Sequence, residues 1–212
     1  MPYGAGIHGG PYHSQSVEAF YGHVPGLKVV CVAAPYDAKG LLKSAVRDPN
    51  PVVFLEHKKA YRLYRQEIPD QDYTIPLGLA EVKRPGKEIT LITYGMMVHH
   101  SLKAAEIAQE EDGLSVEVID LRTVKPLDKE TVLASVKKTG KALIVYEDNL
   151  TGGFGAEVAA IIAEEAFDYL DGPVTRLASP DVPIAPFSSI REDYILPNPG
   201  KIVAALRKLA AY

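Results

Sequence analysis

The sequence predicts an α/β protein of two units, each built on a mainly parallel sheet, with the first unit incomplete. Continuous apolar runs, such as Val29 to Val32 and Val52 to Leu55, are typical of strands buried on both faces of a parallel sheet. Such runs alternate with segments of helical apolar spacing. A charged, proline-containing stretch at about 57–87 separates two series of this kind, so we interpret it as an interdomain linker.

The first unit follows a glycine-rich opening, and its expected elements in order are a helix at about 14–22, a strand at 28–33, a helix at 36–47 and a strand at 51–56. Asp37 lies in the first turn of the second helix, where a carboxylate meets the positive end of the helix dipole. Two strands and two helices are too few to cover a sheet buried on both faces. We therefore interpret the first 56 residues as the rear half of a domain.

The second unit repeats the strand and helix alternation more completely, which indicates βαβ crossovers. We expect strands at 89–94, 116–121, 142–146 and 174–177, and helices at 98–111, 128–138, 154–168 and 199–210. The expected domains are 1–76 and 77–212.

The overall composition excludes several classes of function. With 23 Lys and Arg against 27 Asp and Glu, the net charge of -4 does not favour binding to a nucleic acid. No apolar run approaches the roughly 20 residues that span a bilayer, and the start of the chain does not resemble a secretion signal. The single cysteine, Cys31, lies in an apolar run and is expected to be a buried, inert thiol. A cytoplasmic location is expected.

Three motifs each allow two interpretations. Gly4 to Gly9 has the spacing of a dinucleotide fingerprint but lacks a preceding strand, so a flexible loop is favoured. Leu150 to Glu157 could bind an anion at a helix N-terminus, although a tight turn with closely packed glycines is favoured. Lys58 to Arg65 could contact nucleic acid, but a solvated face or a subunit contact is favoured on an acidic chain.

Histidine is the main candidate for chemistry. None of the six histidines has zinc-ligand spacing, and His99 and His100 are expected at the surface. His13 lies where the glycine-rich loop runs into a helix, so its imidazole could face a cleft. No nucleophile-elbow motif surrounds the adjacent Ser14.

Several consecutive segments resemble the beta subunit of the 2-oxoacid dehydrogenases, the thiamin-diphosphate-dependent first enzyme of the pyruvate and branched-chain oxoacid dehydrogenase complexes. The resemblance runs from about residue 2 to 212. It is carried by Gly9 to Ser16, Pro25 to Val30, Asp37 to Leu42, Pro51 to Glu56, Val118 to Thr123 and Pro126 to Asp128.

This resemblance implies that 1–76 is a partial thiamin-diphosphate pyrimidine-binding domain with its linker, and that 77–212 is a complete transketolase C-terminal-like domain. The implied function is oxidative decarboxylation of a 2-oxo acid and transfer of the acyl group to lipoyl-lysine. The implied partners are an alpha subunit and a second beta subunit, in an α2β2 tetramer, and a lipoylated acyltransferase. The alpha subunit would bind the diphosphate and magnesium, and the main cofactor-binding residues would lie outside this chain. The chain alone is therefore expected to be inactive.

The resemblance also assigns individual residues. His13 occupies the family's His-Ser-Gln position, which serves acyl transfer to lipoyl-lysine, where a departing thiolate needs a proton. A structural potassium ion is implied at the carbonyl of Ala45 with Asp48 and Asn50, although an ordinary turn would also explain this segment.

The substrate is not decided by the sequence. Phe54 to Arg62 resembles branched-chain members more than pyruvate members. The alternatives are a pyruvate- or acetoin-type subunit, a truncated non-catalytic assembly module, and a separate nucleotide-binding protein that uses Gly4 to Gly9.

Overall fold

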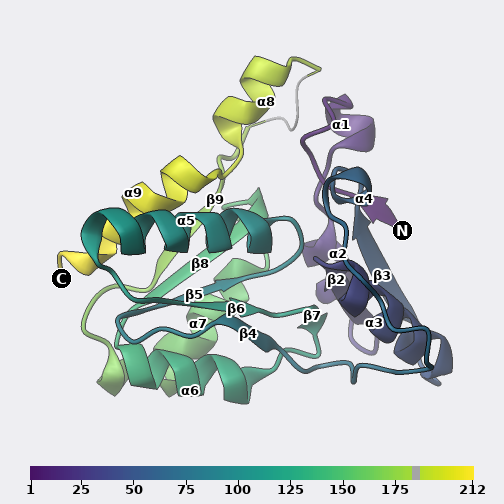
Figure 1. Cartoon of the computed structure of the whole chain (residues 1–212), viewed down its shortest axis with the longest axis horizontal. Helices are drawn as coiled ribbons and strands as arrows, with labels where there is room; N and C mark the ends of the chain where they lie inside the picture. Colours follow the sequence, from purple (N-terminus) through teal and green to yellow (C-terminus); the bar gives the residue numbers. More distant parts are fainter. Residues whose placement is uncertain (183–186) are drawn as a thin grey trace.

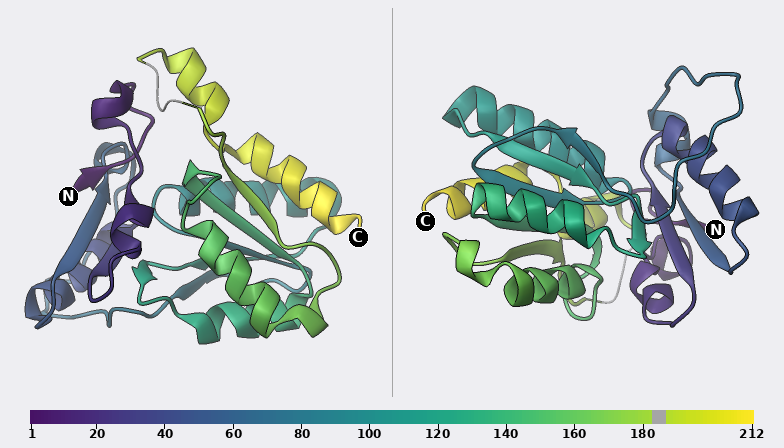
Figure 2. Two further views of the ribbon diagram at one scale, coloured as in Figure 1. Left: turned by 180° about the vertical axis from the view of Figure 1, so that it is seen from behind. Right: turned by 90° about the horizontal axis from the view of Figure 1, so that it is seen from below.

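The computed structural model describes residues 1–182 and 187–212, which form two sheets side by side (Figures 1 and 2). The N-terminal sheet has the strand order β1-β3-β2-β7, and the C-terminal sheet has the order β4-β6-β5-β8-β9. Both sheets are mainly parallel, which confirms the predicted α/β class.

The boundaries of the elements agree with most of the predicted segments. The strands are β1 (Pro2–Tyr3), β2 (Lys28–Val32), β3 (Val52–His57), β4 (Glu81–Arg84), β5 (Ile89–Thr93), β6 (Val116–Asp120), β7 (Thr123–Lys125), β8 (Ala142–Asn149) and β9 (Thr175–Ser179). The helices are α1 (Gly10–His13), α2 (Glu18–Gly22), α3 (Pro35–Arg47), α4 (Ala60–Leu63), α5 (Met97–Asp112), α6 (Lys129–Thr139), α7 (Gly155–Glu165), α8 (Ser189–Ile195) and α9 (Pro199–Ala210), with a 3-10 turn at Phe167–Tyr169.

The N-terminal sheet is covered unevenly. In β2, residues Val29 to Val32 are buried, as expected, and Cys31 is fully buried. In β3, Val52 to Phe54 are only half-buried, so the prediction that this strand is buried on both faces is wrong. The reason is that the other neighbour of β3 is the two-residue strand β1, which covers little of it.

A strand from the second half of the sequence completes the other edge of the N-terminal sheet. β7 pairs antiparallel with β2, with Val29 opposite Lys125 and Val30 opposite Thr123. The sequence analysis did not find β7, because three residues are too few for a period of two to be recognised.

The C-terminal sheet is sandwiched between two pairs of helices. α5 and α9 cover one face, and α6 and α7 cover the other (Figure 1). β4 pairs antiparallel with β6 and forms one edge. Among the described helices, none combines the length and the apolar character that a bilayer span requires.

Three local predictions need correction. The helix expected at 14–22 is shorter and covers only α2, and it is preceded by the separate turn α1, which the hydrogen bond from the Gly9 N–H to the Ser14 hydroxyl closes. The stretch 57–87, interpreted as a linker without secondary structure, contains α4 and β4. α8 was not predicted at all.

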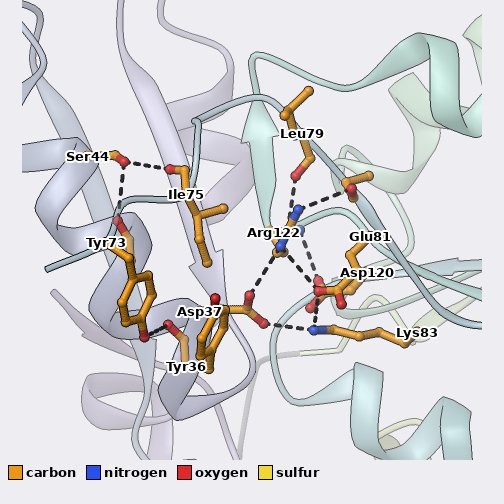
Figure 3. A network of polar contacts seen from close by, with 12 residues as sticks. Tyr36, Asp37, Ser44, Tyr73, Ile75, Leu79, Glu81, Lys83, Asp120 and Arg122 are labelled. Atoms are coloured by element: carbon orange, nitrogen blue, oxygen red, sulfur yellow. Dashed lines mark hydrogen bonds and ion pairs between the residues drawn. The ribbon is translucent and has the colours of Figure 1, made fainter. Parts of the chain in front are cut away.

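A buried ion network joins the two sheets (Figure 3). Asp37 of α3 is 1% exposed, and its two carboxylate oxygens lie 3.2 Å from the Arg122 guanidinium and 2.9 Å from Lys83 Nζ. Arg122 also donates to the backbone carbonyls of Leu79 and Ala80. Because this carboxylate is almost fully desolvated, removing both of its cationic partners would leave it uncompensated, which should cost about 3–5 kcal/mol.

The glycine-rich turn before α7 packs against one aromatic ring. A Cβ at Gly155 would lie 2.1 Å from Cε1 of the fully buried Tyr146, and a Cβ at Gly153 would lie 2.5 Å from the same ring. The Thr151 N–H is already hydrogen-bonded to Asp181 Oδ1 at 3.0 Å. Both observations favour the tight-turn interpretation of Leu150 to Glu157 over the anion site.

The Gly155→Ala substitution should therefore lower the free energy of unfolding by about 2–3 kcal/mol, because the added methyl group meets a ring that cannot move aside. Urea denaturation of the two proteins measures the difference. Gly113→Ala is the control. Its Cβ meets no atom within 4 Å, so the free energy of unfolding should fall only by the strain of the positive φ of 71°, about 1 kcal/mol. An equal loss in the two variants would contradict the packing argument.

Candidate functional site

Polar side chains gather where the strands of the C-terminal sheet end. Tyr94 follows β5, Asp120 ends β6, and Glu147 and Asp148 lie near the end of β8. The carboxyl ends of parallel strands meet at one edge of a sheet. That edge faces the loop formed by residues 4–16 of the N-terminal half, which is joined to it by hydrogen bonds.

Glu147 is the centre of this junction. Its Oε1 atom accepts hydrogen bonds from the Ala5 N–H at 2.6 Å and from the Ser16 hydroxyl at 2.9 Å. Its Oε2 atom lies 2.9 Å from Nε2 of His57, the last residue of β3. All three partners belong to the N-terminal half of the chain, so one carboxylate joins the two halves.

These contacts keep the carboxylate of Glu147 ionised despite its burial. Burial acts to raise the pKa of Glu147, but the charge and the hydrogen bond of His57, together with the donors of Ala5 and Ser16, outweigh it and hold this pKa below its ordinary value. The His57 ring, 3% exposed, packs edge-on against Tyr3 with centroids 5.3 Å apart. It also requires glycine at position 4, where a Cβ would lie 2.2 Å from the ring.

A second buried carboxyl group lies nearby and lacks a cation. Glu18 is fully buried, and its Oε1 accepts a hydrogen bond of 2.9 Å from the Tyr94 hydroxyl. Its Oε2 has no hydrogen-bond partner among the described residues. Burial, reinforced by the charge of Asp148, raises the pKa of Glu18 to about 8, and burial raises that of Asp148 to about 6. Glu18 is therefore protonated at neutral pH.

His13 lies in the second half of the loop 4–16, as the last residue of the one-turn helix α1, and its side chain is exposed. Lys58 Nζ donates a hydrogen bond to its backbone carbonyl. The base of the loop is closed by a hydrogen bond of 3.0 Å from the Gly4 N–H to the Gln15 carbonyl. The loop is thus fixed at its base, while the imidazole is open to solvent.

The tip of the same loop contacts α8. The His8 Nδ1 atom lies 2.5 Å from Oε2 of the fully buried Glu192, and the His8 N–H donates to the same oxygen at 3.0 Å. The Phe187 ring packs over Gly10. Figure 1 shows α1 and α8 side by side at one end of the molecule. The tip of the loop, like its base, is therefore attached to the C-terminal half.

Two neighbouring cavities lie between α2 and the N-terminus of α7. The larger, of about 520 Å³, is lined by Gly22, Lys125, Phe154 and their neighbours. The other, of about 450 Å³, is lined by Gln15, Phe20 and Asp148. Within the described part of the chain, neither cavity includes His13, although Gln15 is only two residues away.

The comparison with known proteins extends over the whole chain. Residues 78–202 match the family described as "Transketolase, C-terminal domain", and residues 1–63 match "Transketolase, pyrimidine binding domain". The chain is 55% identical over 211 residues to the 2-oxoisovalerate dehydrogenase subunit beta of Bacillus subtilis (strain 168) and 50% identical to the pyruvate dehydrogenase E1 component subunit beta of the same organism. The chain belongs to the family of the transketolase C-terminal domain, and over its whole length it is similar to beta subunits of 2-oxoacid dehydrogenases.

The match covers all of this chain but only 64% of each of these two members of the beta-subunit family. The 2-oxoisovalerate dehydrogenase subunit beta 2, mitochondrial, of Arabidopsis thaliana is 49% identical, and 58% of its length is covered. A solved structure described as "Split gene transketolase, inactive beta4 tetramer" superposes with a TM-score of 0.79 at 26% identity, over 99% of this chain and 65% of that one.

The residues proposed for potassium lie together at the end of α3 and the turn that follows it. Asp48 follows α3, and its N–H donates to the Ala45 carbonyl at 3.3 Å. Its carboxylate accepts from Lys28 Nζ and from the side chain and N–H of Asn50. The hydrogen bonds from Lys28 and Asn50 lower the pKa of Asp48, so its oxygens are anionic. In residues 1–182 and 187–212, no three His, Cys, Asp or Glu side chains gather as a metal site.

Two histidines differ from their predicted positions. His99 and His100 were expected at the surface, but both are half-buried. The His99 ring stacks on Tyr64 at 3.4 Å between centroids, and its Nε2 lies 2.7 Å from the Ala33 carbonyl. His99 thus packs between the halves, which the sequence could not indicate because the two stacked rings lie 35 positions apart. His100 Nδ1 lies 3.4 Å from the Pro197 carbonyl, within the C-terminal half.

Glu18 and Glu147 were not among the residues predicted from the sequence. A usable signal was present for Glu147. Two acidic residues, Glu147 and Asp148, end an otherwise apolar strand, where parallel sheets place functional groups. For Glu18 no signal existed, because burial of its short helix depends on the other half of the chain.

The raised pKa of Glu18 predicts a pH-dependent effect of the Glu18→Gln substitution. The folded protein holds the proton on Glu18 up to about pH 8, whereas the unfolded chain releases it near its ordinary pKa of 4.5, so the wild type loses stability between these values as pH rises. The amide carries no proton to lose. The variant should therefore gain stability relative to wild type from pH 5 to 8, by on the order of 2–4 kcal/mol.

Chemical denaturation of both proteins at several pH values measures this difference. The exposed Glu130→Gln is the control and should shift the curve by a constant amount. The titratable groups that interact with Glu18 are unchanged in both proteins: Asp148, Glu147, Tyr94, Tyr3 and Cys31. Parallel curves for Glu18→Gln and wild type would show that Glu18 is ionised in the folded state.

Proposed function

We propose that this chain is part of the beta subunit of a thiamin-diphosphate-dependent 2-oxoacid dehydrogenase of the branched-chain type. The substrate would be a small 2-oxo acid, and the acyl group would pass to lipoyl-lysine of an acyltransferase. The single observation that carries the proposal is the exposed imidazole of His13, held on an anchored loop beside the open edge of the N-terminal sheet. The higher identity to a 2-oxoisovalerate subunit than to a pyruvate subunit supports the branched-chain type.

The proposed assembly is an α2β2 tetramer that also contacts the lipoylated acyltransferase. The alpha subunit would hold the diphosphate and magnesium. We also propose a division of the chain near residue 76, with a partial pyrimidine-binding domain before it and a transketolase C-terminal-like domain after it. The positions of the two family matches, 1–63 and 78–202, support this division.

Thiamin diphosphate, when bound, supplies the nucleophilic carbon and the electron sink for decarboxylation. The described residues do not form a cradle for its ring, because His13 projects into solvent and the outer neighbour of β3 is only two residues long. The main contacts to the cofactor would therefore come from outside these 212 residues. This is also why we propose that the chain is inactive when alone.

The proposed task of His13 is proton transfer. Decarboxylation leaves an electron pair on the carbon that becomes the acyl carbon. When this pair forms the C–S bond to a dithiolane, the S–S bond breaks and the second sulfur leaves as a thiolate. An imidazole titrates near neutral pH and can donate the proton that this sulfur takes up. Exposure suits this role, since the acceptor is carried by another protein and must reach the imidazole from solvent.

Replacing His13 by Ala in a beta subunit of full family length, coexpressed with its alpha subunit, should slow lipoyl acylation by about 10²- to 10⁴-fold. Decarboxylation measured with an artificial electron acceptor should change far less, because no thiolate is then formed. The control is His23→Ala, which removes another exposed histidine, at the end of α2. An equal loss in both assays, or no loss in either, would exclude the role proposed for His13.

We propose that potassium binds at the Ala45 carbonyl with Asp48 and Asn50, since these oxygens are hard ligands that suit an alkali cation. Lys28 already pairs with Asp48 and would have to give way. In that case potassium at ten times its Kd should raise the free energy of unfolding by about 1.4 kcal/mol over an equal concentration of sodium.

Thermal denaturation in matched potassium and sodium buffers measures this effect, which Asp48→Ala should abolish. Asp72→Ala is the matched control, because Asp72 is an exposed carboxylate that pairs with Lys43 and Arg47 and is not one of the proposed ligands. The same response to both salts in the wild type would exclude the ion.

A second candidate function is a non-catalytic assembly module. The similar solved structure is described as an inactive beta4 tetramer, so beta-type chains of this fold can assemble without activity. Exposed apolar side chains, among them Phe20 and Val46, would favour self-association of this chain. Analytical ultracentrifugation with and without an alpha subunit distinguishes the two candidates, since only the first requires the mixed assembly.

A further inference from the structure

We propose that Glu147 is a positioning residue that holds the loop 4–16, and with it His13, from the C-terminal half of the molecule. The inference rests on the role of His13 in the proposed function and adds a residue to it. No motif of the sequence analysis includes Glu147.

Glu147 holds both ends of the loop 4–16 through hydrogen bonds at the loop base. Ala5 and Ser16 lie at the two ends of the loop, and one oxygen, Glu147 Oε1, accepts from both of them, at 2.6 and 2.9 Å. The bond from the Gly4 N–H to the Gln15 carbonyl closes the same base within the N-terminal half. Glu147 therefore fixes the distance between the two ends and also attaches both to β8.

The side chain of Glu147 is itself held in place by burial and by its contact with His57. Its other oxygen pairs with His57, and both side chains are buried, at 7% and 3% exposed. A buried carboxylate has few alternative conformations when three donors surround it, so its position is set by the sheet that carries it. The C-terminal sheet thus fixes the positions of Ala5, Ser16 and His57.

The path from the base to the imidazole is short and internally bonded. The Ser14 N–H donates to the Gly10 carbonyl at 3.0 Å, and the Gly9 N–H donates to the Ser14 hydroxyl at 2.9 Å. α1 is therefore a closed turn that begins six residues after Gly4, and His13 is its last residue. Displacement of the loop base moves α1 as a unit, because these bonds do not need to break, and it is opposed by the contacts of His8 with Glu192 and of Gly10 with Phe187.

The test uses the full-length beta subunit in complex with its alpha subunit, with the substitutions Glu147→Ala, Glu147→Gln and Ser16→Ala. One measurement is amide hydrogen exchange of the peptide covering residues 4–16. The other is the ratio of lipoyl acylation to decarboxylation with an artificial acceptor, which a loss of stability alone would not change. The matched control is Glu117→Ala, which removes another buried carboxylate, bonded to Ser135, Lys138 and the Gly86 N–H away from the loop.

Glu147→Ala should speed exchange in residues 4–16 by about tenfold or more and lower the activity ratio by about tenfold. Ser16→Ala, which removes only one donor and should fold readily, should show about a two- to fivefold effect on both. Glu147→Gln keeps an acceptor oxygen and should restore most of both values. Glu117→Ala should lower the melting temperature without changing either one.

The outcomes separate this inference from the proposed function. If His13→Ala leaves the activity ratio unchanged, the proposed role of His13 is wrong, and the exchange experiment still decides whether Glu147 holds the loop. If His13→Ala lowers the ratio but Glu147→Ala and Ser16→Ala do not, the inference about Glu147 is overturned. It is also overturned if Glu147→Gln is as defective as Glu147→Ala, or if exchange in residues 4–16 is unchanged.

Discussion

The arrangement of the whole chain depends on one buried anion, the carboxylate of Glu147, placed between its two halves. Burial of a charge is unfavourable by several kcal/mol unless hydrogen bonds and an opposite charge offset it. Here every compensating group, Ala5, Ser16 and His57, comes from the other half of the chain. The carboxylate is therefore stable only when the halves are joined, and the joined state has one geometry. This constraint explains why a loop rich in glycine is nonetheless fixed at its base.

The junction combines compensated and uncompensated acids, and the difference determines their charge. Asp37 has Lys83 and Arg122 within 3.2 Å, and Glu147 has His57. Glu18 accepts a hydrogen bond only from the Tyr94 hydroxyl and has no cation beside it, so burial raises its pKa to about 8. Asp120, whose pKa burial raises to about 7, is an intermediate case. The junction between the halves thus holds the ionised carboxylate of Glu147 beside the protonated carboxyl group of Glu18.

Much of the fold could be predicted from the sequence, because β5 is buried along its whole length, β2 is buried after Lys28, and α3 shows a regular apolar face. β1, β7 and α8 could not be predicted, since two, three and seven residues give too little periodicity and their pairing depends on distant segments. The site divides in the same way. His13 was recognisable from a local motif, whereas Glu147 acquires its role through partners 90 to 142 positions away. Whether β3 would be buried depended on neighbours outside its own sequence, so that prediction failed.

The pairing of β7 with β2 has a consequence for any attempt to divide the molecule. Residues 1–76, expressed by themselves, would present the edge of β2 with unpaired N–H and C=O groups along an apolar strand, a surface that recruits other strands. A protease cut in the exposed segment 65–72 would, in contrast, leave the two pieces held together by the sheet they share. The structural unit that must be kept intact is thus longer than either family match. Two copies of the chain could also exchange β7 between their sheets, because every contact in the exchanged pair is already present in one copy.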